Sequence, residues 1–103
     1  MNVHQWTSIT RDYIRLEDIM VDGVAVDIAD LTAALVPIRT QPTGTTTWIT
    51  PTAATDGTPQ ILVAGVDADA TGAVVVTTDM DLWGKVTKTG TTVAAKLARI
   101  NVD

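Results

Sequence analysis

The sequence predicts an all-β fold, a small antiparallel β-sandwich of about seven or eight short strands. Two observations lead to this prediction. Thr and Val recur along the chain, and both favour strands because branching at Cβ restricts χ1. Short apolar runs are separated by Asp, Gly and Thr, most clearly over residues 61–102, which is typical of strands joined by tight turns. A chain of 103 residues is one domain with one modest core.

The N-terminal residues are mixed in character, so we expect an arm over residues 1–12 and the sandwich domain over residues 13–103. Trp6 is the bulky residue of this arm. An aromatic near a terminus more often packs into its own domain, but it can also anchor an arm on a neighbouring molecule. The first clear strand begins at Tyr13, with Ile14 and Leu16 on the same face.

Two patterns organise the next part of the chain. Apolar runs flank Asp22-Gly23, and this is a strong hairpin signal because a type I′ turn needs positive φ at both central positions. A helical turn over residues 29–34 is one option for the segment that follows. We favour a strand over residues 32–39, because Pro37 would interrupt a helix but is tolerated at a sheet edge.

Residues 40–60 are rich in Pro, Gly and Thr, and they predict loops with a short strand at residues 48–49. Three further strands and one hairpin turn are expected after them. The strands cover residues 61–64, 73–77 and 82–87, and the turn covers residues 88–91.

The last segment fits two structures. Val93, Leu97 and Ile100 fall on one helical face, and the alanines between them favour a helix. As a strand, the segment changes its apolar face and needs a bulge near Ala98-Arg99. We favour the strand because a Thr-Gly-Thr turn links it to the preceding one.

Composition excludes several classes of function. The net charge of −5 and the scattered basic residues leave no cationic face for nucleic acid or an acidic membrane, although the charge suits docking onto a basic neighbour. The chain has no Cys, which excludes disulfides, thiolate zinc sites and cysteine nucleophiles. It begins without a secretory signal pattern and has no apolar run long enough for a membrane span. We therefore expect synthesis in a cytoplasm and a soluble or assembled product.

One motif resembles a calcium loop. Asp67, Asp69 and Thr71, followed by Gly72, match its first six positions, where carboxylates bind the ion and Gly allows a sharp turn. The twelfth position is Thr78 rather than the bidentate Glu, and no helices flank the motif. The simpler interpretation, which we favour, is an Asp- and Gly-rich connection between two strands.

The other candidates for chemistry are weaker. Asp79 and Asp81 would point to the same side of a strand, where acid–base work is conceivable but a solvated strand end is the favoured interpretation. His4 is the only histidine, and its spacing from Ser8 matches no ordinary catalytic triad, so a surface position is expected.

The tryptophans allow a platform on which a sugar could stack, if Trp48 and Trp83 were exposed together on one sheet face. The core interpretation is favoured, because a buried Trp supplies much of the apolar burial in a small domain. Trp83 lies between apolar neighbours and is the first choice for a core residue.

Several segments together resemble a family of small virion proteins encoded among the head and head-to-tail genes of tailed phages that infect actinobacteria. The general layout is also similar to the immunoglobulin-like N-terminal domain of phage baseplate upper proteins. The resemblance covers about residues 13–102 and is carried by short motifs rather than by one signature. These motifs are Tyr13-Ile14-Arg15-Leu16, Val26-Asp27, Trp48-Ile49-Thr50-Pro51, Ile61-Leu62-Val63-Ala64-Gly65, Asp81-Leu82-Trp83-Gly84-Lys85-Val86-Thr87 and Ala98-Arg99-Ile100-Asn101-Val102.

The resemblance implies an immunoglobulin-like sandwich with an architectural, non-enzymatic function and no cofactor. The expected protein is head-associated in the virion, as a capsid decoration or minor capsid protein or as a component of the head-to-tail connector. Its partners would be other virion proteins and further copies of itself, and Trp6, His4 and Tyr13 are the candidates for docking. Three alternatives stay open: a carbohydrate-binding sandwich that uses the tryptophans, a tail or baseplate adaptor domain, and a calcium-dependent adhesion domain.

Overall fold

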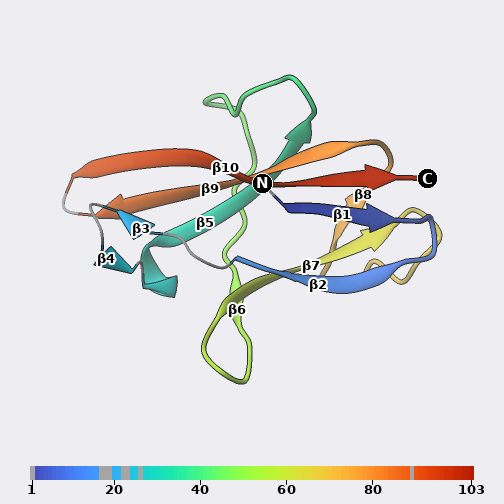
Figure 1. The fold of residues 1–103 in the computed structure, drawn as a ribbon, viewed down its shortest axis with the longest axis horizontal. Helices are drawn as coiled ribbons and strands as arrows, with labels where there is room; N and C mark the ends of the chain where they lie inside the picture. Colours follow the sequence, from blue (N-terminus) through green and yellow to red (C-terminus); the bar gives the residue numbers. More distant parts are fainter. Residues whose placement is uncertain (1, 17–19, 22–23, 26, 89) are drawn as a thin grey trace.

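The structure, a computed structural model, describes residues 2–16, 20–21, 24–25, 27–88 and 90–103. Two four-stranded sheets form the fold (Figure 1). The first sheet has the order β1 (Asn2–Trp6), β10 (Thr91–Val102), β9 (Met80–Lys88) and β5 (Leu31–Pro37). The second has β2 (Arg11–Arg15) beside β7 (Pro59–Gly65), with β6 (Thr52–Ala53) and β8 (Val74–Val76) also paired to β7. Outside these sheets lie the hairpin β3 (Met20–Val21) and β4 (Val24–Ala25) and the 3₁₀ turn η1 (Ile28–Asp30).

This architecture confirms the predicted all-β sandwich. Most of its strand pairs are antiparallel, as expected, but β1 pairs with β10 and β7 pairs with β8 in parallel. Strands β1 and β10 lie at opposite ends of the chain, so local sequence patterns do not reveal their pairing. The described residues contain no helix with the length and apolarity that a membrane crossing requires.

The core lies between the two sheets and is built from alternate residues of their strands. Burial of this apolar surface is the main favourable contribution to folding. The core residues of the first sheet are Trp6, Leu31, Ala33, Leu82, Val86, Ala98 and Ile100. Those of the second sheet are Ile14, Ile61, Val63 and Val76, and Leu16, which directly follows β2, packs with them.

The predictions for the first half of the chain hold in most places. Ile14 and Leu16 are buried while Tyr13 is exposed, as the alternation predicts. Val21 pairs with Val24, which confirms the hairpin, although its turn residues lie outside the described part of the chain. The strand preferred over residues 32–39 is present as β5, after the single turn η1.

The second half follows the predicted order of strands. Residues 48–49 form only an isolated bridge, from Ile49 to Ala33, and the short strand β6 was not expected. The last segment is a strand, and its register shifts between Lys96 and Ala98, next to the position predicted for the bulge. A strand prevails over the helix here because Gly90, with φ 78°, closes the turn that pairs Thr91 with Lys88.

The predicted boundary between an arm and a domain at residue 12 is not seen in the structure. Asn2–Trp6 is a strand of the first sheet, and Arg11 and Asp12 already belong to β2. Trp6 is 4% exposed, so its side chain packs in the core of its own domain.

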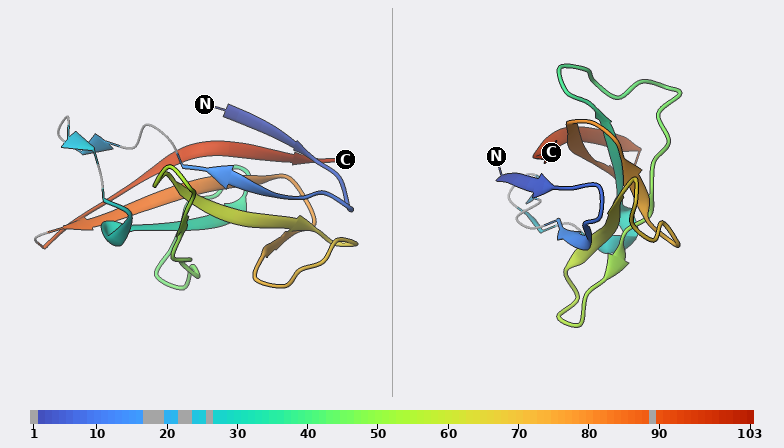
Figure 2. Two further views of the ribbon diagram at one scale, coloured as in Figure 1. Left: turned by 90° about the horizontal axis from the view of Figure 1, so that it is seen from below. Right: turned by 90° about the vertical axis from the view of Figure 1, so that its right-hand side faces the viewer.

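The hairpin of β9 and β10 extends past the ends of β2 and β7 in two perpendicular views (Figure 1; Figure 2, left). Strand β10 has 12 residues, of which the first six, Thr91–Lys96, are exposed. Strand β1 pairs only with its second part, Ala98–Val102. The first half of β10, Thr91–Lys96, therefore presents its side chains to solvent, whereas the part of β9 that pairs with it stays packed, since Val86 is 7% exposed and belongs to the core cluster.

Candidate functional site

The calcium-like segment lies in the connection between β7 and β8, and Arg11 of β2 binds it. The Nε of Arg11 donates to the carbonyl oxygen of Asp69 at 2.9 Å, and its Nη2 donates to that of Thr71 at 3.1 Å. Two oxygens of this connection thus accept hydrogen bonds from a guanidinium. Among the described residues, no group of three or more His, Cys, Asp or Glu is placed to hold a metal.

Both aspartates of this segment have local structural partners, Asp69 through its carboxylate and Asp67 through its backbone. The Oδ1 of Asp69 accepts a hydrogen bond from the backbone N–H of Thr71 at 2.9 Å, and this bond lowers the pKa of Asp69 below its ordinary value. The backbone N–H of Asp67 donates to the carbonyl oxygen of Ser8 at 2.7 Å, which joins the connection to the turn after β1. The arrangement is that of a strand connection stabilised by an Asx turn.

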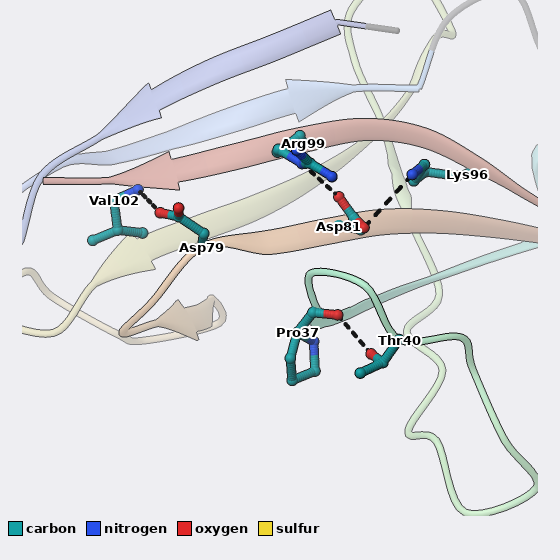
Figure 3. A network of polar contacts seen from close by, with 7 residues as sticks. All are labelled: Pro37, Thr40, Asp79, Asp81, Lys96, Arg99 and Val102. Atoms are coloured by element: carbon teal, nitrogen blue, oxygen red, sulfur yellow. Dashed lines mark hydrogen bonds and ion pairs between the residues drawn. The ribbon is translucent and has the colours of Figure 1, made fainter.

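Asp79 and Asp81 connect β9 to β10 (Figure 3). The Oδ1 of Asp79 accepts a hydrogen bond from the backbone N–H of Val102 at 2.8 Å. Asp81 accepts from the Nε of Arg99 at 3.0 Å, and its other oxygen lies 3.8 Å from the Nζ of Lys96. Asp81 is only 1% exposed, so the expectation of a solvated strand end was wrong. A buried carboxylate needs such partners because desolvation of an unpaired charge is costly.

The three candidates for docking do not form one surface. Trp6 lies in the core, and His4 is half-buried two residues earlier on β1. Tyr13 lies on the second sheet, pairs with Leu62 of β7, and is 48% exposed. Because Ile14 faces the core, Tyr13 points to the outer side of its sheet. Of the three, only Tyr13 presents a large part of its side chain to solvent.

Trp83 and Trp48 are both half-buried. Leu82 and Val86 of β9 face the core, so Trp83 lies on the opposite face and does not belong to the core cluster predicted for it. The Nζ of Lys85 lies 4.3 Å from the centroid of the Trp48 ring, in a cation–π contact. An ammonium therefore occupies one face of the ring that the sugar-stacking hypothesis would use.

A cavity of about 280 Å³ opens on the outer face of the second sheet. Its apolar lining comes from β7, β8 and the segment before β6, and its polar lining includes two outward residues of β2, Arg11 and Tyr13. Tyr13, Thr71 and Gly72 were candidates from the sequence for other reasons, and the lining residues were not predicted to form one site. The alternation of side chains along β2 predicts that Arg11 and Tyr13 share one face, but only the pairing of β2 with β7 brings them to the cavity.

Comparisons with protein-family models, with curated proteins and with solved structures gave no match to this chain. By its fold and its surface, the chain is a small all-β sandwich domain with an exposed first half of β10 and a cavity that opens on its second sheet.

Proposed function

We propose that this chain is a non-enzymatic structural protein of a tailed-phage virion. It is associated with the head, either as a capsid decoration or minor capsid protein or as a component of the head-to-tail connector. The proposal rests on the motif resemblance of residues 13–102 and, above all, on the exposed first half of β10, Thr91–Lys96. The alternative of a tail or baseplate adaptor would use the same kind of contact.

The hairpin supports an architectural function because it exposes an apolar side chain and an open strand edge, and a second chain normally covers such a surface. Val93 is 45% exposed, and the residues around it on β10 are Thr and Ala. Within the described part of the chain, no strand pairs with Thr91–Leu97 on the side where β1 pairs further along. Open strand edges bind other chains readily, through backbone hydrogen bonds and through side chains on either face. A neighbouring virion protein that packs on this hairpin would cover it.

The hairpin variant Val93→Glu tests this proposal, with Val75→Glu as its matched control. Both valines lie on strands, and they are 45% and 43% exposed. Each variant is produced in host cells during infection by phage that lacks the chain, and the purified particles are examined by quantitative mass spectrometry and cryo-EM. We expect the wild type and Val75→Glu to be incorporated at equal levels and Val93→Glu to be reduced at least about tenfold, since a buried charge weakens an interface strongly.

The position of the density then distinguishes the two roles. Icosahedral density over the capsid shell establishes decoration, and one ring at the portal vertex establishes a connector. A wild-type chain that is absent from purified particles refutes the virion proposal. Equal incorporation of Val93→Glu and wild type refutes the contact through the hairpin.

A further inference from the structure

The cavity on the second sheet lies at an interruption in the edge of β7. Strand β6 pairs with Pro59 and Gln60, and β8 pairs with Val63–Gly65, along the edge of β7 that faces away from β2. Ile61 and Leu62 lie between these two short pairings, and both line the cavity. The gap between β6 and β8 thus leaves room for a guest on an otherwise regular sheet.

The lining combines apolar residues with a rim of uncharged hydrogen-bonding groups and one guanidinium. Ile49, Ile61, Leu62 and Val74 are the apolar residues, and Leu62 points to the outer face because its neighbours Ile61 and Val63 face the core. The polar side chains of the rim carry hydroxyl, amide and guanidinium groups and include no carboxylate. They belong to Arg11, Tyr13, Gln60, Thr50, Thr52 and Thr71. A guest that suits this lining has an apolar face and several hydroxyl groups around its perimeter.

One rim group is held in place before any guest binds, and the backbone of a second is fixed by its sheet. The guanidinium of Arg11 is fixed by the carbonyl oxygens of Asp69 and Thr71, at 2.9 and 3.1 Å. Tyr13 is carried by a strand paired over its whole length to β7, and nearly half of its surface is exposed. Alternate residues of a strand are about 7 Å apart, which matches the width of one sugar ring with its substituents. Preorganised groups lose little entropy on binding.

We propose that this cavity binds one pyranose unit of a glycan, with an apolar face of the ring against Tyr13 and Leu62 and with its hydroxyl groups bonded to Arg11 and Gln60. The volume of about 280 Å³ lies at the small end for ligand sites, which suits a single ring rather than a nucleotide. This site is separate from the tryptophans that the sequence suggested for sugar binding. It does not depend on the virion proposal.

NMR titration of the full chain labelled with ¹⁵N tests the site. The probes are the methyl glycosides of glucose, galactose, mannose, rhamnose and N-acetylglucosamine, together with sodium glucuronate and sodium acetate. We expect at least one sugar to shift the amides of Thr52, Gln60, Leu62 and Val74, with a Kd on the order of 1–10 mM. A response to glucuronate alone identifies an acidic pyranose. The proposal is overturned if no sugar shifts these amides up to its solubility limit, or if glucuronate is the only sugar that shifts them and acetate reproduces its shifts.

Variants then test the stacking residue. Tyr13→Ala is expected to weaken binding about tenfold, whereas Tyr13→Phe retains the ring and stays within about threefold of the wild type. Val75→Ala changes an exposed residue of β8 that does not line the cavity, and it should bind as the wild type does. Gln60→Ala provides a second rim variant if Tyr13→Ala does not fold. Unchanged affinity in a folded Tyr13→Ala protein refutes the stacking geometry.

Discussion

Asp81 on β9 accepts a hydrogen bond from Arg99 on β10 at 3.0 Å, although only 1% of Asp81 is exposed. The two residues are direct partners across the antiparallel ladder. This ion pair joins the two longest strands of the first sheet in the part of β10 where Arg99 also pairs with Val3 of β1. It links these strands within the packed part of the sheet, on the same strand as the exposed segment Thr91–Lys96.

Removal of Arg99 should therefore destabilise the fold. We expect Arg99→Ala to lower the free energy of unfolding by about 2 kcal/mol, because the buried carboxylate loses its hydrogen-bond donor. The control is Lys96→Ala, since Lys96 lies 3.8 Å from the same carboxylate and its side chain is 38% exposed. Its loss should cost less than about 0.5 kcal/mol. Urea unfolding measures both variants, and equal losses would contradict the special role of Arg99.

The packing of Trp6 predicts that the first strand is part of the folded unit. Trp6→Ala should lower the free energy of unfolding by about 3 kcal/mol, because a large buried side chain leaves a cavity in the core. Val3, on the same strand, is 51% exposed, and Val3→Ala should change stability by less than about 0.5 kcal/mol. Chemical denaturation followed by far-UV circular dichroism makes the comparison. A Trp6→Ala protein as stable as Val3→Ala would mean that residues 2–6 are an independent arm.

Gly65 allows the close approach of two backbone segments. A Cβ at this position would lie 2.2 Å from the carbonyl oxygen of Thr7 and 2.4 Å from that of Ser8. We expect Gly65→Ala to cost at least about 2 kcal/mol, because the turn between β1 and β2 would have to move. Gly44→Ala is the matched control, since a Cβ there meets no atom within 4 Å. Thermal unfolding of both variants tests the contact, which is disproved if their melting temperatures agree.

The hydrogen bonds of Asp56 predict that the folded protein loses stability in acid. The backbone N–H of Thr58 donates to Asp56 at 3.0 Å, and this bond, with the hydrogen bond from Arg15, lowers the pKa of Asp56 to about 2. A lowered pKa in the folded state means that the carboxylate stabilises the fold above its unfolded pKa, near 3.8, and that this contribution disappears as the pH falls towards 2.

The stability of the Asp56→Asn variant should therefore depend less steeply on pH than the stability of the wild type does. We expect the difference in melting temperature between the wild type and Asp56→Asn to be largest at neutral pH and to shrink as the pH falls from about 4 to about 2. The lowered pKa of Asp69 acts in the same direction in both proteins. An NMR titration of the Asp56 carboxyl carbon provides the direct measurement, and a midpoint near 3.8 would contradict the two hydrogen bonds.

Local patterns along the chain were enough to predict the fold class, most of the strands and the faces of several of them. Alternation placed Ile14 and Leu16 in the core and Tyr13 outside it, because side chains of a strand point to opposite faces in turn. Gly90 and the apolar spacing of the last segment predicted a strand with a bulge, and the register shift lies next to the expected position. These features depend on neighbouring residues, so local patterns contain enough information to predict them.

The contacts between distant segments, in contrast, follow from the three-dimensional fold. The parallel pairing of β1 with β10 buries Trp6 and makes the supposed arm a strand. The pairing of β9 with β10 places Asp81 against Arg99, which turned an expected surface acid into a buried ion pair. The register of β2 on β7 brings Arg11 and Tyr13 to the cavity. Such contacts join residues far apart in the chain, and their free energy depends on the packing of whole sheets, which no short window of sequence records.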